Sequence, residues 1–316
     1  MDQAARQAAT GVLHTLPGHL LWRAQARVSA ALGRILPPGT DIWAHAVLLA
    51  LADHEPQSQR RLAELVAVSG TTMTAVAQGL VDDGLVERVR NPQDRRSYAL
   101  TRTRDGRSAV RRSGPHVARL EEHLTASLTP AQVTWLQAAL RQVIGEQLDA
   151  ETPAALLAST WFLLVRAHHA AHRDFQAALR PLGIEPRDFG TMRAIGATGP
   201  VPQHELAQLL DVSGATVVQI VDGLEAAGLV VRRPDPADRR VHRVELTASA
   251  TDVLARAEEQ ARHSTDALAG GPGSPHLAAL LELLPVLLQA PPPASSTPIS
   301  PHPDQHVRLA GRSRRS

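Results

Sequence analysis

Two short motifs place a carboxylate directly before two guanidinium groups: Asp94-Arg95-Arg96 and Asp238-Arg239-Arg240. An arginine on a tight loop can enter a narrow minor groove, where the negative potential of DNA is concentrated. We expect each aspartate to pair with one adjacent arginine and so hold its loop, while the other arginine contacts DNA; the pattern does not assign which. The alternative is a solvated surface hairpin, because most charge runs are solvated.

Polar side chains near two predicted helix starts form a second set of candidates for DNA contact. Hydroxyl and amide groups on a helix in the major groove can reach the donors and acceptors of base edges. These candidates are Ser69, Thr71, Thr72 and Thr74 in one segment and Ser213, Thr216 and Gln219 in another. Ser69 and Ser213 equally suit the role of helix N-cap. Arg88 and Arg232 are weaker candidates, for contact with phosphates.

Both sets of candidates belong to an internal repeat. The segment from Gln59 to Arg96 recurs from Gln203 to Arg240 at a constant offset of 144 residues, with 18 identities in 38 positions and no gap. Unrelated segments of such composition would agree at roughly one position in ten, so the similarity marks a repeat. The period is as long as a domain, and the chain therefore contains two copies of one domain.

The first copy has the order of elements expected of a winged helix-turn-helix. Apolar spacing and stop signals predict helices, then two strands joined by a polar loop, then two further helices. The predicted helices are His19–Leu36, Trp43–Ala52, one that includes Leu62–Val66, Thr71–Gly84, Asp105–Ser127 and Pro130–Leu148, and the strands are Leu85–Arg90 and Ser97–Thr101.

The second copy repeats this order. Its predicted helices are Ala154–Leu182, Pro186–Gly196, Gln203–Leu210, Ser213–Ala227, Ala248–Leu268 and Pro275–Gln289, the last degraded by Pro285, and its strands lie near Leu229–Arg233 and Val241–Leu246. We therefore expect domains at 1–150 and 151–290. Residues 291–316 are rich in Pro, Ser and Arg and are expected to be disordered. This basic tail either adds nonspecific DNA affinity or has no role.

Composition and charge narrow the class of protein. The formal net charge of +2 is too small to indicate a nucleic-acid partner by itself, so the clustering of charge has to carry that argument. All 33 basic residues are arginine, which fits the codon bias of a GC-rich bacterial genome. The absence of cysteine excludes thiolate chemistry. No apolar run approaches the ~20 residues of a membrane span and no secretory signal is evident, so we expect a cytoplasmic protein without a membrane partner.

The search for catalytic and cofactor motifs is empty. The chain has no nucleophile elbow, no H-E-x-x-H motif and no phosphate-binding glycine loop, so we expect neither an enzyme nor a cofactor. His168, His169 and His172 form the strongest metal-like cluster, because His168 and His172 lie one helical turn apart and could share Zn²⁺. Two imidazoles without an evident third ligand favour a solvated or interfacial face, and we predict no metal.

Several of these motifs together resemble the MarR family of bacterial transcription regulators. The similarity rests on V-S-G-(T/A)-T before the second helix of the helix-turn-helix, G-L-V before the hairpin, and D-R-R in the wing, and it extends to about Gln289. The resemblance implies homodimers whose first and last helices interlock. Here two protomer equivalents are fused, so one chain could close as an intramolecular pseudo-dimer; further self-association of chains stays open.

The resemblance also implies a small aromatic or anionic effector bound between the winged helix and the dimerisation helices. The residues that could line such crevices are Trp22, Trp43 and His45 in the first copy and Trp161, Phe162 and Phe189 in the second. The alternative is that these aromatic side chains are ordinary core or interface residues.

The copies are expected to differ in how they bind DNA. Thr74 and Ala75 correspond to Val218 and Gln219, so the two recognition helices should read different sequences. Arg60 and Arg61 open a helix where the second copy has His204 and Glu205, so the first copy should hold the backbone harder.

The sequence thus predicts a mainly α protein with small β wings, made of two tandem winged helix-turn-helix domains with flanking dimerisation-type helices. The predicted function is a regulator that binds double-stranded DNA as a ligand-responsive repressor. As a pseudo-dimer it would address half-sites about one helical turn, ~34 to 36 Å, apart. The alternative is a protein-interaction or antirepressor module of the same fold that does not read DNA.

Overall fold

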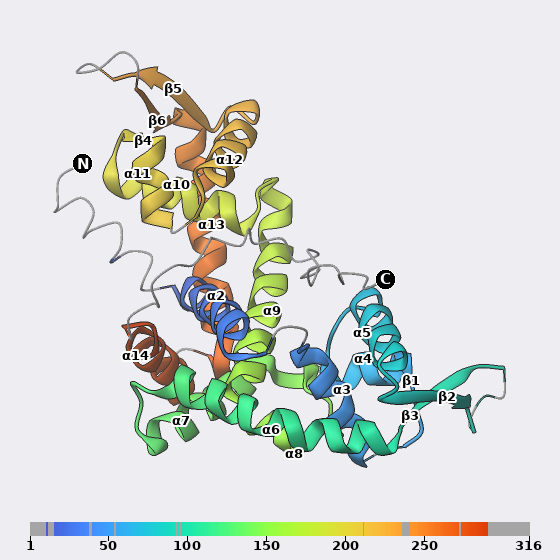
Figure 1. Cartoon of the computed structure of the whole chain (residues 1–316). Helices are drawn as coiled ribbons and strands as arrows, with labels where there is room; N and C mark the ends of the chain where they lie inside the picture. The colour runs from blue at the N-terminus through green and yellow to red at the C-terminus, as the bar shows by residue number, and fades with distance from the viewer. Residues whose placement is uncertain are drawn as a thin grey trace. The chain divides into compact units, whose positions relative to one another are not determined.

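The computed structural model of the chain describes residues 11, 16–37, 40–53, 55–92, 94, 96–210, 212–235, 241–271 and 273–289 (Figure 1). Four predicted DNA contacts lie outside these residues: Arg95, Asp238, Arg239 and Arg240. The predicted disordered tail lies outside them too. None of the helices in the described ranges combines the length and the apolar content that a membrane-spanning helix needs.

Apart from the additional short helix Ala154–Leu157 of the second copy, both copies contain equivalent elements in the same order (Figure 1). The first copy consists of α2 (Pro17–Ile35), α3 (Ile42–Asp53), β1 (Gln57–Ser58), α4 (Gln59–Val66), α5 (Gly70–Asp82), β2 (Val86–Arg90), β3 (Tyr98–Arg102), α6 (Arg104–Thr125) and α7 (Pro130–Ile144). The second consists of α8 (Ala154–Leu157), α9 (Thr160–Leu179), α10 (Pro186–Thr198), β4 (Val201–Pro202), α11 (Gln203–Leu210), α12 (Gly214–Ala226), β5 (Val230–Pro234), β6 (His242–Leu246), α13 (Ala248–Ala267) and α14 (Pro275–Gln289). The predicted fold class is confirmed.

The two small sheets also share topology and register. The strand orders are β1-β3-β2 and β4-β6-β5, and all pairs are antiparallel. Arg88 lies opposite Leu100 in the first sheet, and Arg232 lies opposite Val244 in the second. The strands of the two wings are therefore paired in equivalent register.

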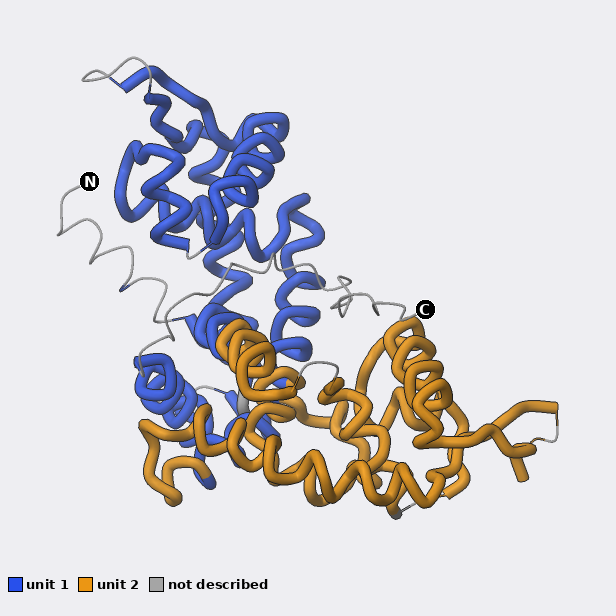
Figure 2. Tube along the Cα trace, viewed as in Figure 1, with its two compact units in different colours: residues 1–24, 134–143, 167–300 blue, residues 25–133, 144–166, 301–316 orange. Residues whose placement is uncertain are grey.

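The described residues divide into two compact units (Figure 2). Unit 1 holds the winged helix of the second copy together with residues 16–24 and 134–143. Unit 2 holds residues 25–133, including the winged helix of the first copy, together with 144–166. The boundaries between units fall inside α2, α7 and α9. They do not follow the junction of the two copies, and domain boundaries at 150 and 290 stay a prediction.

Each recognition helix buries a single apolar stripe. In α5 the buried side chains are Met73, Val76, Ala77 and Leu80. In α12 they are Val217, Ile220, Val221 and Leu224. Spacing of three and four residues places these side chains on one face of a helix, so the remaining positions of each helix face away from its core.

One predicted helix is divided in the structure. A single helix over Ala154–Leu182 is wrong, because α8 ends at Leu157 and α9 begins at Thr160. The partly buried carboxylate of Glu121, on α6, accepts hydrogen bonds from the backbone N–H groups of Thr160 (2.9 Å) and Trp161 (3.1 Å). The first N–H groups of a helix lack intrahelical partners, so this carboxylate fixes a new helix start.

Two details of the secondary structure were not predicted from the sequence. The two-residue strands β1 and β4 were not predicted, because alternation cannot be recognised over two positions. Helix α14 has the predicted bounds and continues through Pro285, so the expected degradation at this proline is wrong.

Gly106 makes the closest backbone approach in the first winged helix. It is buried in the first turn of α6, and a Cβ atom at this position would overlap the carbonyl oxygen of Leu85. That oxygen cannot easily move, because it accepts hydrogen bonds from the backbone N–H (3.1 Å) and the hydroxyl (3.2 Å) of Thr103. As the backbone lies in the first copy, the junction between α6 and the wing leaves no room for a Cβ atom at this position.

We expect Gly106→Ala to lower the free energy of unfolding by about 1 to 3 kcal/mol, because the backbone must shift to admit the methyl group. The second copy accommodates Ala250 at the equivalent position, so folding should survive. Gly79→Ala, in the open interior of α5, is the matched control and should stabilise by up to about 1 kcal/mol. Urea unfolding measures both, and equal stability of the two variants would contradict the steric argument.

Candidate nucleic-acid interface

Serine hydroxyls fix the entry to both recognition helices. The Oγ atom of Ser69 accepts a hydrogen bond from the Thr72 N–H group (3.1 Å), and the Oγ atom of Ser213 accepts one from Thr216 (3.1 Å). The threonine hydroxyls lie 2.9 and 2.8 Å from the same serine oxygens. Both serines therefore act as N-caps, with Thr72 and Thr216 completing the caps.

The turn that precedes α5 is also defined. Ala67 ends α4 in the left-handed conformation, with φ 51°, and its N–H group donates to the carbonyl of Ala63. Such a residue closes a helix and redirects the chain, usually at some steric cost for a residue other than glycine. The direction of α5 depends on this turn and on the Ser69 cap.

The outward faces of the recognition helices differ throughout. The exposed residues of α5 include Thr71, Thr74, Ala75, Gln78 and Asp82. The residues at the equivalent exposed positions of α12 are Ala215, Val218, Gln219, Asp222 and Ala226. Val218 leaves 45% of its surface exposed, which is unusual for valine. Both buried stripes are apolar, whereas the exposed faces differ in polarity.

The first strand of each wing carries an arginine bound to the recognition helix. The Nη2 atom of Arg88 donates to the Oε1 atom of Gln78 (2.9 Å). Arg232 is instead held by two carboxylates, at 2.5 Å from the Oδ1 atom of Asp222 and in a closer pair with Glu225. Arg232 is therefore neutralised locally, whereas the hydrogen-bond partner of the Arg88 side chain within the described residues is a neutral amide.

Gln78 was missed by the sequence analysis. It follows Thr74 by four residues and Thr71 by seven, so it lies on the same face of α5 and the helical period could have found it. It supplies both the amide oxygen that binds Arg88 and an amide nitrogen that donates to Asp82 (2.8 Å).

The turn of the first wing is held by Asp94 through the backbone. Its Oδ1 atom accepts a hydrogen bond from the N–H group of Arg96 (3.0 Å), and its carbonyl accepts bonds from the N–H group (2.9 Å) and hydroxyl (3.1 Å) of Ser97. The carboxylate thus binds a peptide nitrogen, and a pair between Asp94 and the guanidinium of one adjacent arginine stays a prediction. Within the described residues the exposed guanidinium of Arg96 has no ion pair.

The stems of the two wings are built differently. In the first wing Arg90 lies over the ring of Tyr98, with 5.0 Å from its Cζ atom to the ring centroid, and 55% of the tyrosine surface is exposed. In the second wing the buried carboxylate of Asp235 accepts a hydrogen bond from the Nε atom of Arg243 (2.5 Å).

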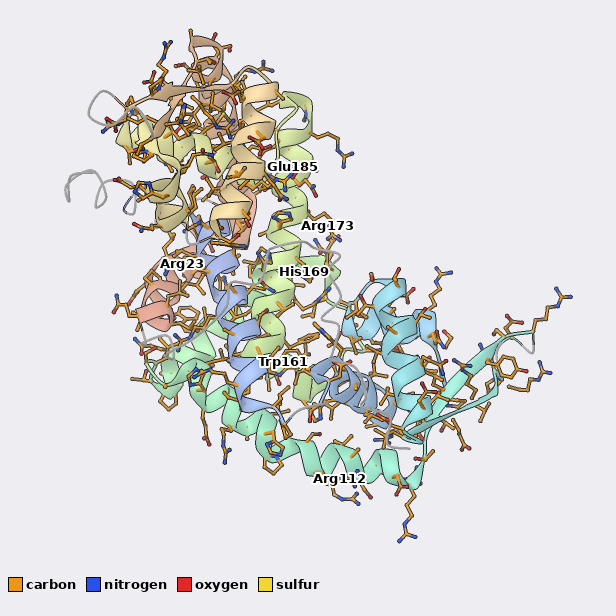
Figure 3. All side chains as sticks on the ribbon, turned by 45° about the horizontal axis from the view of Figure 1, so that its top comes forward. Arg23, Arg112, Trp161, His169, Arg173 and Glu185 are labelled. Atoms are coloured by element: carbon orange, nitrogen blue, oxygen red, sulfur yellow. The ribbon has the colours of Figure 1, made fainter. Side chains whose placement is uncertain are left out.

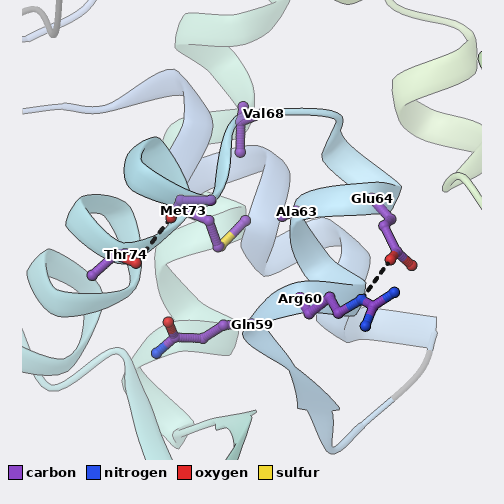
Figure 4. Close-up of a pocket in the computed structure, with 8 residues that line it drawn as sticks. Gln59, Arg60, Ala63, Glu64, Val68, Met73 and Thr74 are labelled. Atoms are coloured by element: carbon purple, nitrogen blue, oxygen red, sulfur yellow. Dashed lines mark hydrogen bonds and ion pairs between the residues drawn. The ribbon is translucent and has the colours of Figure 1, made fainter.

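A hollow of about 460 Å³ opens between α4 and the start of α5 (Figure 4). Arg60 lies at this hollow and pairs with Glu64 (3.3 Å), with 91% of the arginine side chain exposed. Arg61, its neighbour, is occupied by carboxylates, which include Asp149 at 2.5 Å. Only one of the two arginines that open α4 is thus presented to a partner.

Four of the predicted effector residues are buried: His45, Trp161, Phe162 and Phe189. Trp161, on α9, is fully buried and lies edge-on against Trp43, with 5.6 Å between ring centroids (Figure 3). The Nδ1 atom of His45 lies 2.7 Å from the Ser113 hydroxyl, and burial lowers the pKa of this histidine.

Phe162 is buried beside Trp161 in unit 2, with 5.7 Å between ring centroids, and the other two candidates belong to unit 1. Phe189 packs against Phe175 in the core of this unit, and Trp22 lies beside His19. A second hollow, of about 150 Å³, is lined by residues of unit 1 that include Leu182 and Arg256. Neither described hollow includes a predicted effector residue, and the effector site stays a prediction.

The three histidines of α9 lie close together. The His168 ring is 5.6 Å from that of His172 and 5.8 Å from that of His169, whose position on α9 is visible in Figure 3. No group of three side chains in the described ranges is arranged to hold a metal ion. Burial, with smaller contributions from the two neighbouring histidines, lowers the pKa of His168 to about 3.

His168 should make the stability of the protein sensitive to acid. Its pKa in the folded chain lies below the ordinary value of 6.5, so the unfolded chain binds the proton more readily. The stabilisation is therefore complete above pH 6.5 and is lost as the pH falls toward 3. Replacement of His168 by Gln should reduce the loss of unfolding free energy between pH 7 and 5 by up to about 2 kcal/mol. Identical pH dependence of wild type and variant in urea unfolding would refute this.

The caps make a separate prediction. Ser69→Ala removes an acceptor from the start of α5 and should lower the free energy of unfolding by about 1 kcal/mol. Ser69→Asp keeps a cap acceptor and is the matched control. Thermal unfolding followed by circular dichroism measures both, and an alanine variant as stable as wild type would show that the cap contributes nothing.

Both winged helices are similar to known proteins of one family. The family model described as MarR family matches residues 39–97 and 182–241, one match in each copy. The "Putative transcriptional regulatory protein for hcr operon" of Thauera aromatica is 33% identical over 99 residues, which are 31% of this chain and 60% of that protein. The "Uncharacterized HTH-type transcriptional regulator YcgE" of Bacillus subtilis is 43% identical over 75 residues, 23% of this chain and 49% of that protein. The chain thus spans less than two thirds of these two relatives.

A third relative is covered more fully. The "HTH-type transcriptional repressor NicR" of Pseudomonas putida is 32% identical over 133 residues, 42% of this chain and 84% of NicR. Among solved structures, "Transcriptional repressor, CouR, bound to a 23-mer DNA duplex" is 31% identical, with a TM-score of 0.33 over 34% of this chain and 75% of CouR. Apo MarR from E. coli is 24% identical, with a TM-score of 0.34 over 37% of this chain and 87% of MarR. With both copies matched and NicR aligned over most of its length, the chain belongs to the MarR family as a tandem duplication.

Proposed function

We propose that the chain is a sequence-specific regulator of transcription that binds double-stranded DNA with both winged helices. The observation that carries this proposal is the presence of two separately capped recognition helices, each with an apolar face buried and a polar or mixed face exposed. A helix presented in this way fits the major groove, where the four base pairs are distinguishable.

Within this proposal the side chains take different roles. On α5, Thr71, Thr74 and Gln78 contact base edges, and on α12 Gln219 does so. Val218 is suited to the methyl group of thymine, because it presents an exposed apolar side chain. The capping residues stay with the helix starts, where their hydroxyls come nearest to phosphates: Ser69, Thr72, Ser213 and Thr216.

The arginines of the wings provide backbone and minor-groove contact. Arg96 is the described candidate, since its peptide N–H is fixed by Asp94 while its guanidinium is exposed without an ion pair in the described ranges. Arg88 is favoured over Arg232 for phosphate contact, because Arg232 is already held by Asp222 and Glu225. The wing arginines that the structure does not describe, Arg95, Arg239 and Arg240, belong to the same proposal.

The different faces of α5 and α12 favour a site with two unlike half-sites, read by one chain as an intramolecular pair. A homodimer selects a palindrome, because its two readers are identical.

Repression is favoured by the relative NicR, whose name describes a transcriptional repressor. The buried indole Nε1 atom of Trp161 has no hydrogen-bond partner among the described residues. An effector bound near Trp43 and Trp161 could accept the hydrogen bond that this N–H group offers.

The test is selection of binding sites from fragmented DNA of the source organism, at about 150 mM salt to suppress nonspecific binding. We expect one enriched site with two unlike half-sites. Arg96→Ala should weaken binding to all sequences and reduce the salt dependence by about one phosphate contact, whereas Gln219→Ala should relax one half-site. Arg173→Ala, on α9, is the matched control for loss of one exposed arginine.

Two outcomes would overturn parts of this proposal. A perfect palindrome as the best site would indicate a dimer of chains that use equivalent copies. No enrichment by the intact chain, with and without aromatic carboxylates as trial effectors, would favour a protein-interaction module that keeps the fold. A variant with Arg95, Arg96, Arg239 and Arg240 all changed to alanine should lose enrichment, and retained enrichment would exclude the wings as DNA contacts.

A further inference from the structure

The segment that connects the two copies is fastened to the first helix-turn-helix. Asp149 binds the guanidinium of Arg61, on α4, with both carboxylate oxygens: the Nη1–Oδ2 distance is 2.5 Å and the Nη2–Oδ1 distance is 3.0 Å. A bidentate pair of this kind is stronger and more directional than a single contact. It joins residues separated by 88 positions within unit 2.

Two more carboxylates surround the same guanidinium. Glu151 of the connecting segment pairs with the Nη2 atom of Arg61, and Glu64 of α4 lies 3.4 Å from its Nη1 atom. The N–H group of Glu151 donates to the Oδ1 atom of Asp149 (2.8 Å), which orders the two acidic residues beside each other. Three carboxylates therefore surround Arg61, and only 28% of its side chain is exposed.

Hydrogen bonds hold the connecting segment against the end of α4. The hydroxyl of Thr152 donates to the carbonyl of Leu65 (3.4 Å). Arg166, from α9, donates to the carbonyls of Gln147 (2.8 Å) and Ala67 (3.3 Å). Ala67 is the left-handed residue that starts the turn into α5, so these contacts act on the element that directs the recognition helix.

The location of Arg61 matters for DNA. In a helix-turn-helix, the helix before the recognition helix crosses the DNA backbone, where cations at its start can meet phosphates. Asp149 and a phosphate are alternative anionic partners for one guanidinium, since both accept its parallel N–H donors. Glu64, Asp149 and Glu151 all bind Arg61, so a phosphate that takes this guanidinium must displace carboxylates.

We propose that Asp149 and Glu151 of the connecting segment compete with DNA phosphate for Arg61 and so weaken the hold of the first copy on the DNA backbone. This inference rests on the proposed function. It applies to the first copy alone, because Glu205 occupies the position of Arg61 in the second copy. The connecting segment thereby sets how much of the affinity comes from the backbone and how much from the bases read by α5.

The test compares the full-length double variant D149N/E151Q with wild type on the selected DNA and on a scrambled duplex, at several salt concentrations. We expect affinity for both duplexes to rise about tenfold near 100 mM salt, and the salt dependence to steepen by one to two phosphate contacts. The matched control is D252N/E259Q, which removes the same charges from exposed positions of α13. An equal gain in the control would reduce the effect to net charge and overturn the proposal.

Arg61 itself provides the decisive comparison. In the wild-type background Arg61→Ala should change DNA affinity less than twofold, because its guanidinium is already occupied. In the D149N/E151Q background the same substitution should abolish the gain and restore the original salt dependence. Equal effects of Arg61→Ala in both backgrounds would overturn the proposal.

Folding and function can be separated in this design. If the double variant does not fold, as judged by circular dichroism, E151Q alone is measured, because 52% of the Glu151 side chain is exposed. That variant should give a smaller gain of the same sign, and no gain would overturn the proposal. If wild type binds DNA and neither variant gains affinity, only this inference fails. If wild type does not bind DNA, the proposed function itself fails.

Discussion

The burial of one apolar stripe on each recognition helix is the constraint on which the rest of the structure depends. Met73, Val76 and Leu80 can enter the core together only in one rotation of α5, and that rotation decides which side chains face outward. The same holds for Val217 and Leu224 in α12. Because packing fixes only this face, the opposite face could diverge between the copies without loss of the fold.

Backbone capping then fixes how each element starts. Ser69 caps α5, Asp94 holds the turn of the first wing, and Glu121 stabilises the start of α9. Each of these side chains accepts peptide N–H groups. Helix starts and tight turns leave such groups without partners, so a side-chain acceptor there is a structural requirement. Polar residues in a motif that suggests DNA contact can therefore serve the structure by accepting peptide N–H groups, as Asp94 and Ser69 do.

The sequence predicted what depends on local periodicity and on the repeat, and missed what depends on partners far along the chain. Helix spacing found α11 and the bounds of α14, and the offset between copies found both wings. The break before α9 was missed because Glu121, which causes it, lies 39 residues from Thr160. The pairing of Arg61 with Asp149 was missed because no local pattern links an arginine in one helix to a carboxylate near the end of the copy.

In each copy carboxylates neutralise one arginine, and this neutralisation suits a chain in which two copies are joined. If both copies read DNA as proposed, the second contact with DNA is intramolecular, so an adequate total affinity needs less from each copy. If both copies also held phosphates with every arginine, nonspecific binding would rise with each contact and the base contacts would discriminate less. Arg61 in the first copy and Arg232 in the second are each held by carboxylates, at different places in the fold. In the proposed function, such neutralisation would leave base reading by α5 and α12 to determine where the protein binds.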